Sequence, residues 1–134
     1  MEQLPVKMLG ISNVTAEQIE TLCDFATVKP SFVQNRCFAQ LGWDSDVRRV
    51  CEANGIIYQG FSLLTANVRE LASPSIRGIA AAHQVGVAQI VFAFALHVGM
   101  VCLTGTTDAQ HMTEDLAARE IELSKGEIEI ISRC

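Results

Sequence analysis

The chain has 134 residues, of which 49% are hydrophobic and only 19% are charged, and its formal net charge is −5. This length suits one domain, and the low charged fraction predicts either strands buried on both faces or a surface meant for a partner. The negative charge and the lack of a basic run argue against nucleic acid and anionic membranes as partners.

Neither a membrane span nor a secretion signal is expected. No apolar run reaches the roughly 18 residues that a membrane-spanning helix needs, and the N-terminal residues do not resemble a signal peptide. The five cysteines are scattered without a CxxC pair, which favours a reducing cytoplasm as the location. We expect Cys23, Cys51 and Cys102 to be small core residues.

The first quarter of the chain predicts a strand, a helix and a second strand. Residues 6–11 are mostly apolar and predict a strand. Thr15 and Gln18 have the spacing of a capping box, which predicts a helix over residues 16–26. A short strand over residues 31–35 follows.

The middle of the chain repeats this order. Asp44 or Ser45 is expected to begin a helix over residues 46–54, because Asn54-Gly55 is a common helix stop. A third strand over residues 56–61 follows at once, and a loop leads on from it.

The next stretch is predicted to be helical and then extended. Ser73-Pro74 indicates a helix start, since proline is favoured in the first helical turn. Gly86 interrupts this helix, and a very apolar helix follows over residues 87–98. The fourth strand is predicted over residues 100–104.

Two helices complete the predicted elements. Thr107 or Asp108 is expected to cap a helix over residues 108–118, and the last helix begins at Ser124, with Glu127 at capping-box spacing. Alternating strands and helices with apolar strands predict an α/β fold with a parallel sheet and helix cover. Periodicity leaves two architectures open: a small doubly wound sheet, or part of a (β/α)8 barrel.

Polar groups and one aromatic ring stand where the predicted strands end. These residues are Ser12-Asn13, Gln34-Asn35, Phe61-Ser62 and Gly105-Thr106-Thr107. In both architectures, ligands bind at the carboxyl ends of parallel strands. Uncharged donors and acceptors beside a flat ring suit a neutral heteroaromatic ring that bears an amide, and a Gly-Thr-Thr turn before a helix suits a phosphate. Each feature alone also has an ordinary explanation as a turn, a buried amide or a helix cap.

Several blocks of sequence occur together in one order: "LGISNVTAEQIETL", "KPSFVQNRC", "GIIYQGFSLL", "SIRGIAAAHQVGVAQIVFAFALHVGMV" and "GTTDAQHMTEDL". Together they resemble the C-terminal half of the aldo-keto reductases. The resemblance implies a single domain over residues 1–134, built as four βα units of a (β/α)8 TIM barrel with outer helices. It also implies NADP(H) or NAD(H) as the cofactor, bound without a Rossmann motif.

The same resemblance implies roles for residues at the nicotinamide end of the cofactor. Three residues match those that hold the nicotinamide carboxamide: Ser12, Asn13 and Gln34. Phe61 matches the aromatic residue, usually tyrosine in the family, that stacks on the nicotinamide ring.

Further residues match the pyrophosphate and adenosine regions. Two fall in the turn that contacts the pyrophosphate: Ser62 and Leu64. Four fall where the family holds the adenosine end: Gly105, Thr106, His111 and Asp115. Gly105 and His111 replace a usual lysine and arginine, and Asp115 replaces a common asparagine. Fewer cations predict a weaker preference for NADP, so NAD or no cofactor becomes more plausible.

The family's catalytic Asp, Tyr, Lys and His come from the first half of the barrel and have no counterpart here. The only tyrosine, Tyr58, has the opposite strand parity to Phe61, and no acid–base pair or metal site is predicted at the strand ends. The chain alone is therefore expected to be catalytically incomplete. Two hypotheses remain: a subunit completed by a separately encoded N-terminal half, or a non-enzymatic half-barrel that self-associates. We expect a homodimer or a higher homo-oligomer, because the first and fourth strands would be free edges.

Overall fold

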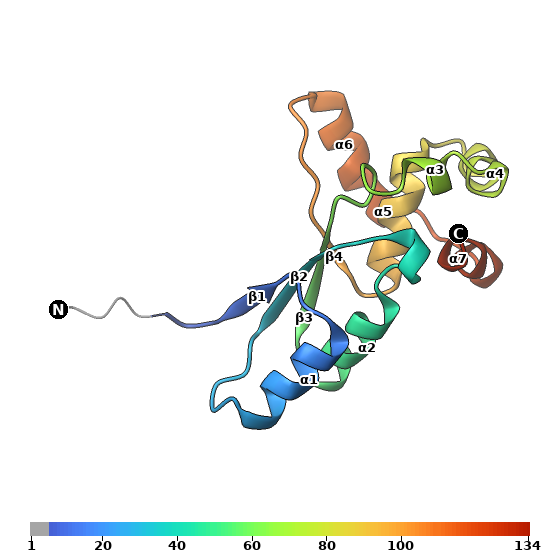
Figure 1. The fold of residues 1–134 in the computed structure, drawn as a ribbon. Helices are drawn as coiled ribbons and strands as arrows, with labels where there is room; N and C mark the ends of the chain where they lie inside the picture. The colour runs from blue at the N-terminus through green and yellow to red at the C-terminus, as the bar shows by residue number, and fades with distance from the viewer. Residues whose placement is uncertain (1–5) are drawn as a thin grey trace.

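The computed structural model describes residues 6–134, which contain a sheet of four parallel strands in the order β1-β2-β3-β4 (Figure 1). The strands are β1 (Gly10–Ser12), β2 (Phe32–Arg36), β3 (Ile57–Phe61) and β4 (Val101–Cys102). Neighbouring strands in space are thus also consecutive along the chain. A doubly wound sheet would reverse its strand order at a switch point, so the structure has the barrel arrangement.

Helices connect the strands and follow the last one. They are α1 (Ala16–Phe25), α2 (Ser45–Ala53), α3 (Val68–Leu71), α4 (Pro74–Ala82), α5 (Val87–His97), α6 (Ala109–Ala117) and α7 (Lys125–Ser132). Two short 3-10 turns, Ala39–Leu41 and Ala118–Glu120, precede α2 and follow α6. The sequence did not predict α3, which is a single turn inside the loop expected after β3.

Local capping signals place most of the helix starts. The Thr15 hydroxyl accepts a hydrogen bond from the Gln18 N–H at 3.2 Å, and the Gln18 side chain accepts one from the Thr15 N–H at 2.9 Å. Ser124 and Glu127 form the same reciprocal pair at the start of α7. These contacts confirm both predicted capping boxes.

The helices cover only one face of the sheet. Val33 and Tyr58 alternate with more exposed neighbours along their strands and are buried in the helix layer. Figure 1 shows α1, α2 and α5 grouped on one side of the strands. The core of this layer is α5, where every residue from Ile90 to Ala95 is buried. The other face of the sheet has no helix over it in the described part of the chain.

A tryptophan fastens the C-terminal helix to the core. Trp43 is fully buried, and its ring lies 5.3 Å from the ring of Phe94, measured between centroids. Its indole Nε1–H donates to the Ile131 carbonyl at 2.8 Å, which anchors α7. A buried indole N–H that lacks a partner would be destabilising, so this contact also fixes the ring orientation.

The two outer strands are shorter than predicted. The sequence indicated strands over residues 6–11 and 100–104, whereas β1 has three residues and β4 has two. The hydrogen bonds between β1 and β2 begin where the Ser31 N–H donates to the Leu9 carbonyl. Residues 6–8 come before this point and have no strand beside them. At the other edge, the last hydrogen bond between β4 and β3 is the one from the Leu103 N–H to the Gly60 carbonyl.

Candidate functional site

Three of the predicted nicotinamide-binding residues share the uncovered face of the sheet. Ser12 is paired in register with Gln34, and Gln34 is paired with Gln59. Residues paired across parallel strands point to the same side, so these side chains form one row. Phe61 lies two residues beyond Gln59 and therefore faces the same side, closer to the carboxyl end. The structure thus brings Ser12, Gln34 and Phe61 together at the strand ends.

Sequence reasoning missed Gln59 as a member of this row. The Gln34 Nε2 donates to the Gln59 Oε1 at 3.2 Å. The side-chain oxygen of Gln34, Oε1, does not take part in this hydrogen bond. The signal that could have found Gln59 is strand alternation, because it has the same parity as Phe61. An amide held in this way presents an acceptor of fixed direction at the strand ends.

The turn after β1 is fastened by the second strand. Asn13 has a left-handed backbone with φ of 56°, which asparagine tolerates better than most residues, and its N–H donates to the Gln34 carbonyl at 3.1 Å. Asn35 is buried on the helix side, accepts from the Val14 N–H at 3.0 Å and donates to the Val14 carbonyl at 2.7 Å. Asn35 therefore positions the turn that carries Ser12 and Asn13.

Tyr58 lies on the opposite side of the sheet, as its parity predicted. It is buried in the helix layer, and its hydroxyl donates to the Asp44 Oδ2 at 2.7 Å. Burial raises the pKa of Tyr58 far above its ordinary value. This phenol is accordingly part of the structural core and is not placed to protonate a ligand at the strand ends.

The thiols behave as core residues. Cys23 and Cys51 are buried, as predicted, whereas Cys102 is half-buried because it lies on the free edge of β4. Burial raises the pKa of Cys37 to about 12 and the pKa values of Cys51 and Cys102 to about 11. Thiols with raised pKa values are poor nucleophiles, so none of these three is a candidate for thiolate chemistry.

The turn after β3 and the loop after β4 enclose a pocket of ≈ 230 Å³. Its lining includes Ser62, Leu64 and Gly105, together with Leu103. The structure thus brings together two residues predicted for the pyrophosphate region and one predicted for the adenosine end. Ser62 has a left-handed backbone with φ of 58°, which directs the chain out of β3 into this turn.

A buried asparagine holds that turn in place. The Asn67 side chain accepts from the Ala39 N–H at 2.7 Å and donates to the Leu63 and Cys37 carbonyls at 2.7 and 2.9 Å. Its three partners belong to the loop after β2 and to the turn after β3. The shape of the pocket therefore depends on a polar contact that the sequence analysis did not identify.

The start of α6 differs from the phosphate site that the Gly-Thr-Thr turn suggested. The Asp108 carboxylate accepts from the Gln110 and His111 N–H groups at 2.8 and 3.1 Å, and these two bonds lower the pKa of Asp108. The Thr106 hydroxyl accepts from the Asp108 N–H at 3.1 Å. A carboxylate thus already occupies the positive end of the helix, and the turn acts as a cap.

The remaining predicted adenosine-end residues lie along α6. The Thr104 hydroxyl donates to the Asp115 Oδ2 at 3.0 Å, which ties the loop after β4 to the helix. His111 is exposed near the start of the same helix. Asp115 also lines a pocket of ≈ 340 Å³ with Arg119, which places one cation beside this region.

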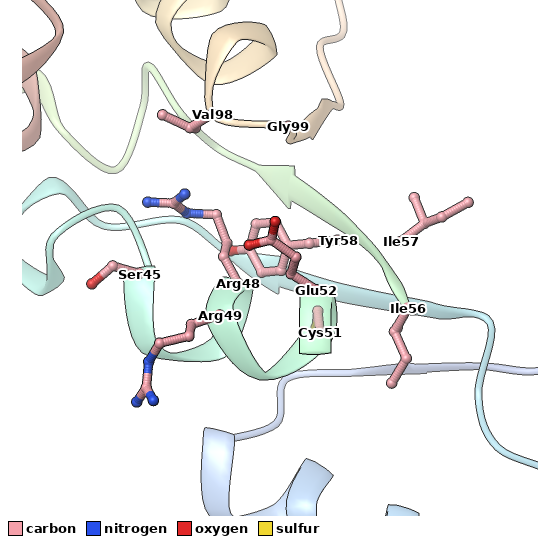
Figure 2. A pocket seen from close by; sticks show the side chains of 10 residues that line it. All are labelled: Ser45, Arg48, Arg49, Cys51, Glu52, Ile56, Ile57, Tyr58, Val98 and Gly99. Carbon is pink, nitrogen blue, oxygen red and sulfur yellow. The ribbon is translucent and has the colours of Figure 1, made fainter. Parts of the chain in front are cut away.

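A separate pocket of ≈ 390 Å³ lies at the other end of the strands (Figure 2). It is lined by Arg48, Glu52 and the amino end of β3, with Val98 and Gly99 opposite. The Arg48 Nε donates to the Trp43 carbonyl at 2.8 Å, so this side chain also has a structural contact. The pocket shares no residue with the row at the carboxyl ends of the strands.

Two further properties concern the described residues as a whole. Residues 6–134 contain no group of three or more His, Cys, Asp or Glu side chains placed to hold a metal ion. In the same range, no single helix has the length and hydropathy to cross a membrane, and only α4 and α5 taken as a pair bent by 90° meet that test.

Comparison with known proteins gives one consistent match. Residues 5–134 match the family model described as "Aldo/keto reductase family". The chain is 25% identical over 134 residues to "Aldo-keto reductase family 1 member A1" of Xenopus tropicalis, covering 93% of this chain and 41% of that protein. It is 28% identical to "Deoxymugineic acid synthase 1" of Zea mays, covering 95% of this chain and 42% of that protein. The chain thus spans less than half the length of these relatives.

Solved structures agree on the fold. A crystal structure of Gox0644 in its apo form superposes with a TM-score of 0.84 at 23% identity, covering 96% of this chain and 46% of that one. An aldo-keto reductase crystal structure complexed with NADPH gives a TM-score of 0.83 at 20% identity, covering 95% and 42%. This likeness confirms the predicted fold of four βα units of a TIM barrel.

Proposed function

The chain belongs to the aldo/keto reductase family, and we propose that its strand ends form the nicotinamide-nucleotide-binding part of an NAD(P)H-dependent oxidoreductase. One relative, from Glycine max, is described as an "NAD(P)H-dependent 6'-deoxychalcone synthase", and one solved neighbour is complexed with NADPH. The residues at the strand ends of this chain have the chemistry that such a cofactor requires.

One observation carries the proposal: Ser12, Gln34 and Phe61 share one face at the carboxyl end of the sheet. A hydroxyl and an amide can satisfy both the N–H and C=O groups of a carboxamide, and an aromatic face can stack on the ring that bears it. Gln59 supports this arrangement by accepting a hydrogen bond from Gln34. The pocket at Ser62, Leu64 and Gly105 lies beside this row, where the rest of a dinucleotide would extend.

Cofactor preference follows from the charges at the adenosine end. Gly105 carries no cation there, and His111 is exposed near the start of α6. Asp108 and Asp115 add negative charge close to both. We therefore propose weak binding without a strong preference for NADP over NAD, because a 2′-phosphate would lie near two carboxylates.

Catalysis, in this proposal, needs acid–base residues supplied by a further half of the barrel. Among residues 6–134, the hydroxyl of the tyrosine donates a hydrogen bond to Asp44 in the helix layer. The face of the sheet that carries Phe61 presents uncharged amides and apolar groups at its centre. A separately encoded N-terminal half-barrel could supply an acid and a base at the same mouth. The chain alone is proposed to bind the nucleotide without reducing aldehydes.

Calorimetric titration with NADPH and with NADH tests the binding proposal. Phe61→Ala should weaken the affinity about fivefold, which corresponds to roughly 1 kcal/mol of lost stacking. Phe25→Ala is the matched control, since Phe25 is 72% exposed on α1 and away from the row. Binding of neither nucleotide at millimolar concentration, or equal affinities for the two variants, would refute the proposal.

A second function has its own supporting observation. The Asp108 carboxylate occupies the helix start where a phosphate was expected, and its pKa is lowered there, so it stays charged. This arrangement favours a non-enzymatic half-barrel that binds no ligand. Asp108→Asn separates the two functions. If the variant binds the nucleotide more tightly than wild type does, a binding site at α6 is supported. If neither wild type nor the variant binds the nucleotide, the ligand-free alternative is supported.

A further inference from the structure

The face of the sheet without helices is apolar and has no charge at its centre. Strand pairing places these side chains on it: Phe32, Ile57, Phe61, Val101 and Leu103, with Gln34 and Gln59 hydrogen-bonded between them. The strands also place one charged side chain on this face, that of Arg36, at the carboxyl end of β2. Its guanidinium lies 5.4 Å from the centroid of the Phe38 ring. Two such faces could pack against each other without burying a charge.

Both edges of the sheet present unpaired backbone together with an apolar flank. β1 and β4 each have a strand neighbour on one side only. Beside β1 lies a pocket of ≈ 650 Å³ lined by Ile11, Leu22 and Phe25, and beside β4 lies one of ≈ 340 Å³ lined by Leu96 and Leu116 among others. A strand added at either edge would satisfy the backbone groups and cover these side chains.

The shortening of the outer strands is consistent with a missing neighbour. The inner strands have five residues each, within one residue of the predicted ranges 31–35 and 56–61, while β1 and β4 have three and two. Val6 and Met8, which precede β1, are 72% and 62% exposed. Residues 6–9 and 103–104 have a strand-like sequence and would extend both strands if a partner lay alongside.

The exposed area of the chain indicates how large the missing contact is. The whole chain exposes 8695 Å², whereas a compact monomer of 14.6 kDa exposes about 6,900 Å². The excess is about 1,800 Å² per chain, and the total includes residues 1–5. A contact between two copies of about 2,000 Å² in total would lie in the range of obligate homodimers.

From these features we infer that a second copy of this chain covers the open face and closes an eight-stranded barrel. A twofold axis along the strands places β1 of each copy beside β4 of the other, and all eight strands stay parallel. Eight strands give an interior that side chains just fill. A twofold axis across the strands would instead pair like edges antiparallel and leave the sheet open. The inference goes beyond nucleotide binding and does not depend on it.

Light scattering on the purified 134-residue chain at micromolar concentration tests the inference. We expect a mass twice 14.6 kDa. Val101→Lys places a charge on the inner face at the β4 edge and should weaken the dimer at least tenfold. Met8→Lys should act in the same direction, and it cannot unfold the monomer by burying a charge because Met8 is exposed. Val68→Lys, on exposed α3, is the matched control and should leave the dimer intact.

Hydrogen exchange distinguishes a closed barrel from other dimers. The amides of Met8, Gly10 and Thr104 alternate with residues whose backbone groups bond to the inner strands, so they face the free edges. They should be protected in the dimer and become unprotected in Val101→Lys and Met8→Lys. A monodisperse monomer would overturn the inference and leave the face to another partner, such as a separate half-barrel. A dimer in which these amides exchange freely would overturn it as well, because the edges would then be unpaired.

Discussion

Replacing Asn67 with alanine removes the contact that joins two loops beneath the candidate pocket. Asn67 is buried, and its side chain makes three hydrogen bonds, all to backbone groups. Alanine leaves the Ala39 N–H and the carbonyls of Cys37 and Leu63 without these partners. No other residue in the described part of the chain donates to either carbonyl or accepts from that N–H.

The cost of the substitution is large relative to the stability of such a domain. Each buried polar group that loses its partner costs about 1–3 kcal/mol, and partial access of water lowers the sum for three groups to roughly 3–5 kcal/mol. Typical domains unfold with about 5–15 kcal/mol. Asn67→Ala should therefore lower the melting temperature by about 10–20 °C.

Urea unfolding followed by circular dichroism at one fixed protein concentration measures this change, since self-association would otherwise alter the apparent stability. Asn54→Ala is the matched control, because Asn54 is half-exposed and its amide donates to one helix carbonyl, Val50, at 2.9 Å. The control should lose less than about 1 kcal/mol. If the two variants lose equal free energies of unfolding, the proposal that Asn67 holds the two loops together is refuted.

Two further substitutions test packing and charge. Gly60→Val should destabilise the protein by about 1–3 kcal/mol in thermal unfolding, because a Cβ at Gly60 would overlap the Met100 sulfur. Glu127→Gln should reduce the loss of stability in acid. The Ser124 N–H lowers the pKa of folded Glu127, so its contribution is present above the ordinary glutamate pKa and is lost as the pH falls through the lowered value. Urea midpoints for Glu127→Gln and wild type at pH 6 and in mild acid give the comparison.

Each of these has a control on the same chain. Gly78→Ala on α4 meets no atom within 4 Å and should be neutral or slightly stabilising, so a loss equal to that of Gly60→Val would contradict the packing argument. Glu122→Gln changes an exposed carboxylate whose side chain makes no hydrogen bond in the described residues. If both glutamine variants respond to acid alike, the cap at Ser124 does not carry the effect.

Features set by neighbouring residues were predictable from the sequence. The capping boxes at Thr15 and Ser124 depend on side chains three positions apart, and both are present. The opposite directions of Tyr58 and Phe61 follow from strand alternation alone. Periodicity alone, by contrast, did not choose between a doubly wound sheet and a barrel, because no local pattern contains the strand order. The resemblance to the aldo-keto reductases predicted the barrel, and the observed strand order agrees with it.

Features that depend on distant contacts were missed or altered. Asn67 joins segments about thirty positions apart, and the role of Gln59 depends on its register with Gln34. The lengths of β1 and β4 depend on what lies beside them, and an apolar run cannot report whether a neighbour is present. Asp108, at the start of α6, was predicted as a cap, but its effect on an expected phosphate site appeared only with the geometry.

The bond from Trp43 to Ile131 has a consequence for the order of events on the ribosome. The two residues are 88 positions apart, and translation proceeds at about 5–20 residues per second, so the indole emerges roughly 4–18 s before its acceptor. During that interval the nascent chain can form the earlier βα units while the pocket around Trp43 stays open on the side that α7 later covers. Because Trp43 is the single tryptophan, the emission of a stalled nascent chain would report the moment at which α7 arrives.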